Sequence, residues 1–489
     1  MLTRLLLASA SFLAAWQLCG ADVVDQQFVG GEQQVFNVPE SVLPTTKYVV
    51  VLDASSMNTR LHLYDFAISP SGLPNYKSKK FFRPNDAGLY SYISSWPGPR
   101  NVTAGAESLR PLIEHAKKLI PAEVHPETLL VLRASEILHA HPAPWPQRLM
   151  QTIHSWLNKT ENVPFKLLSD VAQIIERSDH LAYVWAGMNC VLNPEGNRDV
   201  AVITMSRFDT QVAFLPQVEL SGYQAAPIQL GDKSYPLFRT SLPGTDTTRI
   251  TSQILKSLVR NRTDEELEQG HMLASGNGVV PVVPNPCFAR HNEQYVTLEP
   301  DVKVLLKDED APANDPVGPY IMSGKGLAEF ELCAELVDEH MRRIPLFNET
   351  KAAIPPIPET SRVLLTGAFD AILEPALLSP EASLDASELH VTTVRKIADL
   401  ARLFCLGAAA RNSGYTQFLN AYNKLLEERK PSWCLDLTIV HRILVLGYGL
   451  DDSREVMFGQ KVKGLETTDW TLGVALKAIM DERVEILRE

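Results

Sequence analysis

Two pairs of apolar runs predict strands joined by short polar turns. Residues 48–52 form a continuous apolar run rich in valine, typical of a strand buried on both faces, and a second run follows at 61–66. The same arrangement recurs between residues 199 and 215. In each pair a threonine, Thr59 or Thr210, lies close to the start of the second run. The pattern therefore predicts an internal repeat of one strand–loop–strand unit.

Other segments have the spacing of helices. Apolar residues at i, i+3 and i+4 predict amphipathic helices over 109–120, 391–404 and 470–486, and Asp469 is a candidate N-cap for the last of these. Residues 301–319 are acidic and rich in proline, which indicates a surface loop. Strands and helices in this order predict an α/β fold.

The N-terminus predicts the compartment. One cation, Arg4, is followed by an apolar stretch and then by small residues up to Ala21. This pattern predicts a secretory signal peptide over 1–21, with an uncleaved signal anchor as the alternative. Residues 22–46 are polar, and we expect a flexible lead-in there. The mature chain is expected to be secreted or lumenal, in the Golgi or endoplasmic reticulum.

Composition narrows the class of partner. The 489 residues include 46 Lys and Arg against 58 Asp and Glu, a net charge of −12. Because phosphate-backbone binding depends on cations, a nucleic-acid partner is not expected. No second apolar run has the length of a membrane span, so none is expected in the mature chain.

Cysteines and sequons fit an oxidising lumen. Five cysteines follow the predicted signal peptide, so four can pair and one is left over. Their wide spacing is unlike that of zinc ligands. Four Asn-x-Ser/Thr sequons are candidate glycosylation sites: Asn101, Asn158, Asn261 and Asn348.

Short motifs then resemble one family in order and spacing. The segment 51–60, Val-Leu-Asp-Ala-Ser-Ser-Met-Asn-Thr-Arg, looks like the first signature of the apyrases. These are the nucleoside triphosphate diphosphohydrolases, which include Golgi guanosine and uridine diphosphatases. Trp185 with Asn189 looks like the third signature, and Cys-Leu-Asp-Leu-Thr from Cys434 and Trp-Thr-Leu-Gly from Trp470 match later landmarks. The resemblance covers nearly the whole mature chain.

The resemblance implies a fold and a domain plan. The fold is α/β, a two-lobed actin-like (ribonuclease H-like) phosphotransfer fold, each lobe a mixed sheet with flanking helices. Lobe I would comprise 47–172 plus 455–489, and lobe II 173–454. It also implies the disulfides Cys287–Cys333 and Cys405–Cys434. Cys190 is then expected to be a buried free thiol.

The family's chemistry needs a phosphate cradle, a divalent cation (Ca²⁺ or Mg²⁺) and a base that orients water. In the first loop the resemblance assigns phosphate binding to Asp53, Ser56, Thr59 and Arg60, and assigns the cation to Asp53. Ser55 and Asn58 occupy glycine positions, and Met57 replaces a hydroxyl residue. Gln211 completes the expected phosphate-binding set from the second loop.

The other signatures depart further from the family. Ile137 replaces a glycine and His139 an arginine in the second signature, and His180 stands at the water-polarising glutamate of the third, beside Asp179. His180 and Asp179 are therefore candidate catalytic residues. Ile439 replaces an aromatic residue that stacks on the base.

The fourth signature differs most. Thr204 stands at its metal-side aspartate, and Ser206 and Arg207 replace its glycines. Arg207 and Phe208 would project toward the phosphate, and Arg207 could attract Asp53. Asp209 is a candidate relocated base.

Two hypotheses follow. The first is a catalytically degenerate apyrase-like protein of the secretory pathway, binding or regulatory, with little phosphohydrolase activity, no cofactor and an unknown protein partner. The second is an active nucleoside diphosphatase or triphosphatase with a rearranged site, a hydrolase of phosphoanhydride bonds that uses Ca²⁺ or Mg²⁺. A nucleoside diphosphate or another diphosphate is the expected ligand in either case.

Overall fold

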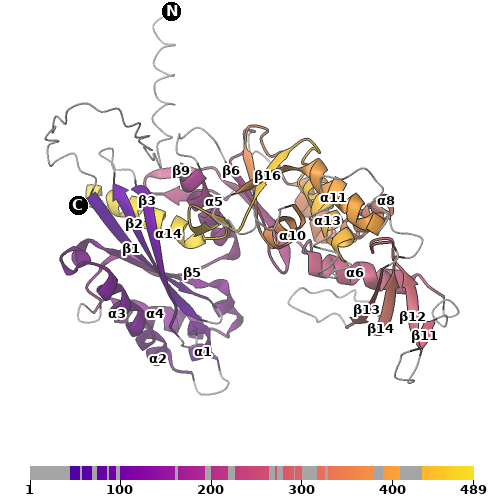
Figure 1. Ribbon diagram of the computed structural model, residues 1–489. Helices are drawn as coiled ribbons and strands as arrows, with labels where there is room; N and C mark the ends of the chain where they lie inside the picture. Colours follow the sequence, from indigo (N-terminus) through magenta and orange to yellow (C-terminus); the bar gives the residue numbers. More distant parts are fainter. Residues whose placement is uncertain are drawn as a thin grey trace, which may run out of the picture.

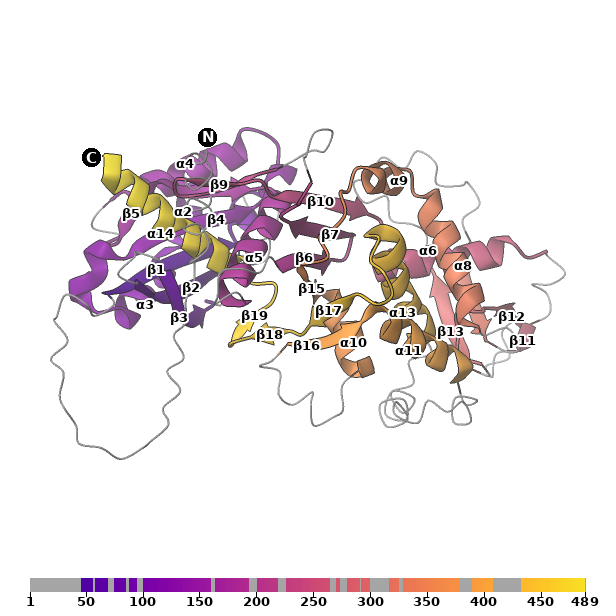
Figure 2. The same cartoon turned by 90° about the horizontal axis from the view of Figure 1, so that it is seen from above.

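The computed structural model describes fifteen segments of the chain: 45–55, 58–68, 74–84, 88–94, 100–159, 163–192, 200–218, 226–263, 270–272, 279–290, 292–299, 316–324, 329–377, 389–407 and 432–488. The predicted signal peptide, the lead-in as far as residue 44, and Ser56 lie outside them. Two lobes lie side by side in Figures 1 and 2. The α/β class is confirmed.

A five-stranded sheet forms the centre of lobe I, in the order β3-β2-β1-β4-β5. Its strands are β1 (Thr45–Ala54), β2 (Thr59–Ile68), β3 (Pro74–Phe82), β4 (Leu129–Ser135) and β5 (Lys166–Ile175). β1 pairs antiparallel with β2 and parallel with β4. Val50 and Leu52 face one core while Val49 and Val51 face another, which explains the continuous apolar run of a strand covered on both sides.

Helices cover one face of this sheet (Figure 1). They bury an apolar stripe that includes Leu112, Ile113 and Ala116 against Val50 and Leu52. The helices are α1 (Leu89–Ile93), α2 (Val102–Glu107), α3 (Arg110–Leu119), η2 (Ala122–Glu127), η3 (Glu136–Ala140) and α4 (Trp145–Leu157). The predicted helix over 109–120 is α3.

Lobe II has a six-stranded sheet in the order β10-β7-β6-β15-β17-β16. The strands are β6 (Val200–Met205), β7 (Asp209–Phe214), β10 (Phe238–Pro243), β15 (Arg362–Gly367), β16 (His390–Thr393) and β17 (Glu455–Phe458). β6 pairs antiparallel with β7 and parallel with β15, as β1 does with β2 and β4. The predicted internal repeat is therefore present.

Helices and smaller sheets complete lobe II (Figure 1). The helices are α6 (Thr247–Arg260), α8 (Phe330–Arg343), α9 (Pro345–Ala352), α10 (Ala368–Leu377), α11 (Val394–Leu406), α13 (Trp433–Arg442) and the π-helical turn η7 (Ile443–Gly447). A four-stranded sheet at the far end contains β11 (Gly270–Met272), β12 (Val279–Pro284), β14 (Gly318–Ser323) and β13 (Glu293–Leu298). Two hairpins are β8 (Ile228–Leu230) with β9 (Lys233–Tyr235), and β18 (Lys461–Val462) with β19 (Leu465–Glu466).

Two helices connect the lobes. α5 (Arg177–Leu192) runs from β5 toward β6, and α14 (Trp470–Arg488) packs beside it and against β1 (Figures 1 and 2). Their crossing is close, because a Cβ at Gly473 would lie 2.1 Å from the carbonyl oxygen of Tyr183. Only glycine fits there, so Gly473 fixes the distance between the two helices.

Some predicted boundaries differ from the structure. The helix expected over 391–404 begins at Val394, because residues 390–393 pair with β17 as edge strand β16. The lobe boundary expected at 455 falls on β17, which pairs with β15 of lobe II. The three apolar residues of β17 are too few to show the alternation of apolar and polar positions that predicts a strand. The loop expected over 301–319 lies mostly outside the described residues, and its last two positions begin β14.

Both predicted disulfides, Cys287–Cys333 and Cys405–Cys434, are present. The expectation of a free thiol at Cys190 is wrong: Cys190 is disulfide-bonded, and its partner lies outside the described residues. Spacing alone does not reveal such pairing. Among the helices that the structure describes, none has both the length and the apolar character to cross a bilayer.

Candidate functional site

The first loop of the repeat follows Asp53 near the end of β1. Asp53 pairs in register with Arg60 of β2, whose Nη1 lies 3.9 Å from Asp53 Oδ2. Arg60 Nε donates a 2.6 Å hydrogen bond to Asn58 Oδ1. Three of the four phosphate-binding residues predicted in the first loop are thus placed at one turn, together with Asn58, while Ser56 lies outside the described residues.

Buried polar atoms surround Asp53. His62 Nε2 lies 3.9 Å from Asp53 Oδ2. Burial raises the pKa of Asp53 to about 6, against the opposing charge of Arg60. Burial and the charge of Lys79 lower the pKa of His62 to about 3, so His62 is neutral at physiological pH. Neither ring nitrogen of His62 nor Thr59 Oγ1 has a hydrogen-bond partner among the described atoms. Unpaired buried donors and acceptors at a loop are suited to a polar ligand.

A second carboxylate lies behind this loop. Asp469 accepts hydrogen bonds from Lys79 Nζ at 2.6 Å and from Tyr64 Oη at 2.9 Å. It also accepts from the backbone amide of Thr471 at 3.1 Å, which confirms its predicted role at the start of α14. Its negative charge helps to raise the pKa of Asp53. The sequence showed Asp469 only as a helix cap, and no local signal connects it with Lys79.

The second loop, between β6 and β7, has the same backbone turn as the first. Ser206 N donates to Asp209 O at 2.9 Å, as Ser55 N donates to Asn58 O at 3.0 Å. This equivalence supports the alignment of the two loops that the sequence predicted. Arg207 is exposed at the tip of the second turn.

The side chain of Asp209 accepts three hydrogen bonds. Its Oδ1 accepts from Ser206 Oγ at 2.5 Å, and its Oδ2 accepts from Gln211 Nε2 at 2.9 Å and from Ser241 Oγ at 2.6 Å. Gln211 itself is therefore engaged with Asp209. These three hydrogen bonds fix the orientation of the Asp209 carboxylate. No pattern along the chain indicates Ser241, which β10 brings alongside β7.

Thr204 lies in β6 beside the end of β15. It pairs in register with Thr366, and a Cβ at Gly367 would approach Thr204 Oγ1 to 3.1 Å and Met205 O to 2.5 Å. Gly367 has φ of 76°, which only glycine adopts without strain. A threonine hydroxyl therefore stands where the resemblance places the aspartate that helps to hold the metal ion.

The two candidate residues at the start of α5 have structural partners. The ring of His180 stacks on Trp470 with centroids 4.5 Å apart and planes 16° from parallel. Asp179 Oδ1 forms a 2.8 Å ion pair with Arg239 Nη1 of β10. Both contacts join α5 to neighbouring elements near the crossing of α5 and α14.

The structure also places the residues of the second signature and Ile439, where this chain differs from the family pattern. Ile137 and His139 lie on η3, directly after β4, whose Ala134 pairs with Ala54 at the end of β1. The second signature is thus placed next to the first loop. Ile439 is fully buried in the core of lobe II and presents no face for a base.

The described donor set does not fit a divalent cation. Hard cations take several oxygen ligands, usually with one or two carboxylates. At the two loops Asp53 faces Arg60, Asp209 already accepts three hydrogen bonds, and position 204 carries a hydroxyl. Within the described ranges, no three His, Cys, Asp or Glu side chains group in a way that could hold a metal ion.

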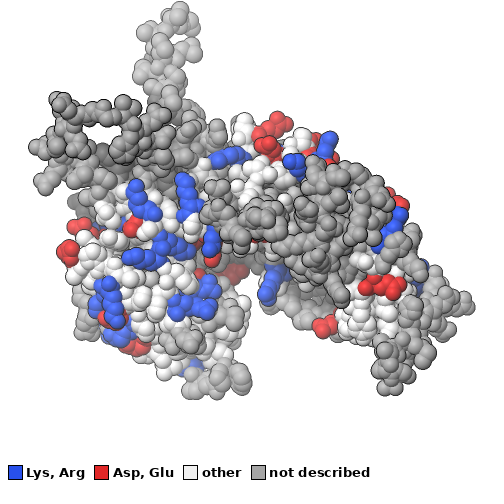
Figure 3. All heavy atoms as spheres, in the orientation of Figure 1, with Lys and Arg blue, Asp and Glu red and all other residues white. Residues whose placement is uncertain are grey.

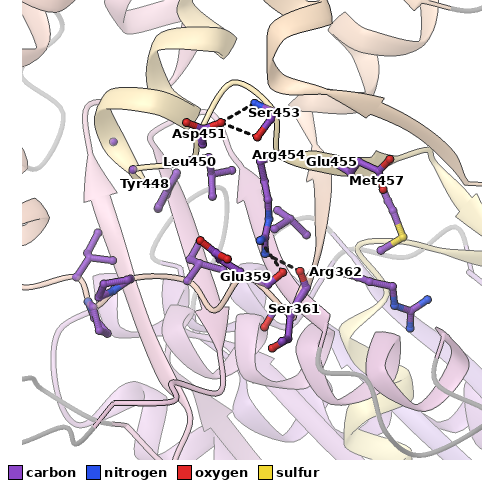
Figure 4. A pocket seen from close by; sticks show the side chains of 18 of the residues that line it. Glu359, Ser361, Arg362, Tyr448, Leu450, Asp451, Ser453, Arg454, Glu455 and Met457 are labelled. Carbon is purple, nitrogen blue, oxygen red and sulfur yellow. Dashed lines mark hydrogen bonds between the residues drawn. The ribbon is translucent and has the colours of Figure 1, made fainter.

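A cavity of about 940 Å³ lies elsewhere in lobe II, where β15 and β17 begin. Figure 4 shows Arg454 at the centre of this cavity. Its guanidinium donates hydrogen bonds to backbone carbonyls of the loop that precedes β15. The second repeat loop lies at the opposite, carboxyl end of β6, the first follows β1 in lobe I, and no predicted site residue lines the cavity.

The four sequon asparagines are exposed: Asn101, Asn158, Asn261 and Asn348. Each is therefore accessible in the folded chain, and glycosylation remains a prediction.

Comparison with known proteins supports the resemblance. Residues 42–486 match the model of the GDA1/CD39 (nucleoside phosphatase) family. The chain is 27% identical over 470 residues to a probable guanosine-diphosphatase of Aspergillus fumigatus, covering 90% of this chain and 86% of the relative. It is 23% identical to the guanosine-diphosphatase of Saccharomyces cerevisiae, covering 88% and 80%.

A solved structure shows the same fold. A nucleoside triphosphate hydrolase from Neospora caninum superposes with a TM-score of 0.53 at 15% sequence identity, covering 90% of this chain and 93% of the other. At this identity the match concerns the fold alone. It confirms the fold class expected from the resemblance.

Proposed function

This chain belongs to the GDA1/CD39 (nucleoside phosphatase) family, and from that premise we propose that it binds nucleoside diphosphates at its two repeat loops and hydrolyses them far more slowly than an intact site of the family. Its expected ligand follows the relatives, which are named guanosine-diphosphatases. The side chains at the loops account for the slow hydrolysis.

One observation carries the proposal: the carboxylate described at the second loop is held by three hydrogen bonds, and a hydroxyl stands at the other expected carboxylate position. Asp209 accepts from Ser206, Gln211 and Ser241, and Thr204 stands at the other expected carboxylate position. His180, at the position of the water-polarising glutamate, stacks on Trp470. Removing a single electrostatic or acid–base group typically costs about 10² in rate or more, and several are changed here.

Support for retained binding comes from the first loop. Asp53, Thr59 and Arg60 meet at one turn, and Thr59 Oγ1 and the ring nitrogens of His62 are buried without hydrogen-bond partners among the described atoms. A diphosphate, with its acceptor oxygens, could use Thr59 Oγ1–H and a ring N–H of His62. These two donors would hold and orient a ligand without transferring a proton to it.

Calorimetric titration of the full chain with guanosine diphosphate and, separately, uridine diphosphate tests the binding claim. Saturable binding of either nucleotide, weakened about tenfold or more in Thr59→Val, is the expected result. Lys80→Met is a matched control in the same sheet, because Lys80 is exposed on edge strand β3. Absence of binding to both nucleotides would contradict the proposal.

The second candidate is an active nucleoside diphosphatase. The relatives' names favour it, because two proteins named guanosine-diphosphatase match this chain over most of their length. In this case Asp209, with Ser206, Gln211 and Ser241, would position the attacking water from the second loop. Steady turnover that falls by about 10² or more in Asp209→Asn would establish this alternative.

We further propose that the protein works in the secretory pathway. Support comes from the two disulfides within lobe II, which form and persist in oxidising compartments. The four exposed sequon asparagines are consistent with that compartment. A shift in electrophoretic mobility after treatment with an N-glycosidase, lost when all four are changed to Gln, tests the glycosylation.

A further inference from the structure

The cavity in lobe II lies beside one of the sequons. It is lined by the loop that leads into β15, by the turn that follows η7, by β16 and β17, and by Lys351 of α9. Asn348, which begins the sequon 348–350, precedes Lys351 by three residues on the same helix. Residues three apart on a helix are surface neighbours, with Cβ atoms about 5–6 Å apart. The sequon is therefore at the rim of the cavity.

Hydrogen bonds fix the walls of the cavity. Arg454 donates bonds of 2.6 to 2.7 Å to three backbone carbonyls of residues 358–361, two of which are drawn in Figure 4. Tyr448, another lining residue, donates from Oη to Thr210 Oγ1 at 2.8 Å. Walls held in this way form a binding site that needs little ordering when a ligand enters.

The charges that line the cavity cancel. Three are cations and three are carboxylates: Lys351, Arg362, Arg454, Glu359, Asp451 and Glu455. Figure 3 shows acidic and basic side chains mixed along the upper edge of lobe II, above β16. Glu359 and Glu455 are exposed, and neither carboxylate accepts a hydrogen bond from another described side chain. The cavity thus offers hydrogen-bond acceptors without a net charge.

Apolar side chains complete the lining: Pro356, Val391, Leu450 and Met457. Val391 is 60% exposed. Apolar surface with carboxylate acceptors suits a sugar, whose ring presents C–H faces and whose hydroxyls donate hydrogen bonds. A phosphate, in contrast, would be repelled by Glu359 and Glu455. The lining therefore favours a neutral ligand rich in hydroxyls.

A glycan on Asn348 has this chemistry and is tethered at the rim. An N-linked glycan begins with neutral sugar rings rich in hydroxyls. Asn348 is exposed, and its Nδ2 donates a 2.6 Å hydrogen bond to Arg342 O. A glycosylated amide keeps one N–H, so this bond is compatible with the modification. Because a tethered ligand has an effective concentration of about millimolar, weak contacts are enough to hold it in place.

We propose that the glycan attached to Asn348 folds back onto the protein and occupies the cavity, where its hydroxyls donate hydrogen bonds to Glu359 and Glu455. The inference rests on the glycosylation proposed above and is independent of nucleotide binding. Docking of the glycan makes and breaks no covalent bond.

The test is digestion of the folded full chain, produced in a glycosylating host, with an N-glycosidase. Mass spectrometry gives the rate of release at each sequon. The glycan on Asn348 should be released about tenfold or more slowly than those on the other three asparagines, because a docked glycan is cleaved only after it leaves the cavity. In the double variant Glu359→Ala, Glu455→Ala, release from Asn348 should become as fast as from the other sites.

The matched control is the double variant Glu335→Ala, Glu466→Ala. Both residues are exposed carboxylates outside the cavity, so the slow release from Asn348 should persist. Since Glu359 and Glu455 are exposed too, their double variant should keep the wild-type melting temperature, which separates lost docking from lost folding.

The outcomes that overturn the inference are distinguishable. Absence of a glycan on Asn348 would contradict the glycosylation proposed for that site, and the inference with it. A glycan on Asn348 that is released as fast as the others would overturn docking and leave the glycosylation standing. Slow release that is unchanged in the Glu359→Ala, Glu455→Ala variant would exclude this cavity as the docking site.

Discussion

The Nζ atom of Lys79 lies 2.6 Å from Oδ2 of Asp469, and this ion pair joins the edge strand of lobe I to the residue that precedes α14. The side chains are 14% and 2% exposed. Tyr64 Oη and the amide and hydroxyl of Thr471 donate to the same carboxylate. The sheet of lobe I and the start of α14 are therefore joined by a buried, hydrogen-bonded cluster.

Replacing Lys79 with Met should destabilise the fold strongly. The change leaves Asp469 as a buried charge without its cation, which typically costs about 3–5 kcal/mol. Denaturation by urea measures the free energy of unfolding. Lys80→Met, at an exposed position on the same strand, should stay within about 0.5 kcal/mol of wild type. Equal effects of the two variants would contradict the assignment.

Asp370 should make stability depend on pH. Burial raises its pKa to about 7, against the hydrogen bond that Gly459 N donates to Oδ1 at 2.9 Å. In the unfolded chain its pKa is about 3.9. Between these values the folded chain binds a proton that the unfolded chain releases. The stabilisation is therefore complete below about pH 4 and is lost as pH rises through 7.

Asp370→Asn should remove this dependence. Melting temperatures of wild type and variant, recorded from pH 4 to pH 8, test it. The stability of wild type relative to the variant should fall with rising pH by at most about 1.4 kcal/mol per unit. Asp232→Asn, at an exposed position, is the control. Parallel curves for wild type and Asp370→Asn would show that Asp370 does not titrate in this range.

Much of the fold follows from local sequence. The apolar run at 48–52 and the period-3.6 spacing of 470–486 each specify one element, and both occur as predicted. The repeat was predictable because its two units share one pattern. The four-residue strands β16 and β17 were not, since each depends on pairing with a neighbour that is distant in the chain.

The site was predictable to a lesser degree. Asp53 and Arg60 were expected at one turn because both flank it. Lys79 and Asp469, in contrast, are 390 residues apart, and no pattern along the chain reports their contact. The resemblance marked Asp209 as a candidate base, but its hydrogen bond from Ser241 became visible only when β10 was placed beside β7.

Loss of the Cys405–Cys434 disulfide should lower stability. It closes a loop of 29 residues between α11 and α13, and removing such a bond typically costs about 2–5 kcal/mol. Thermal unfolding of the double variant Cys405→Ser, Cys434→Ser should show a lower melting temperature than wild type under non-reducing conditions. Under reducing conditions the two curves should approach each other. An unchanged melting temperature would contradict this role.

The stack of His180 on Trp470 is expected to be structural. Replacing His180 with Ala should cost about 0.5–1.5 kcal/mol beyond the loss of buried area, as for other stacked aromatic pairs. Phosphate release by this variant, normalised to folded protein, should equal that of wild type. A clear fall in normalised phosphate release would instead assign His180 to the chemistry.

Release of inorganic phosphate from guanosine diphosphate, measured for wild type and Asp53→Ala in saturating Ca²⁺ or Mg²⁺, tests the central claim most directly. We predict rates close to background and equal in the two proteins, while the nucleotide still binds. A wild-type turnover of about 1 s⁻¹ or faster that disappears in Asp53→Ala would contradict the account, because enzymes with intact sites commonly reach that rate.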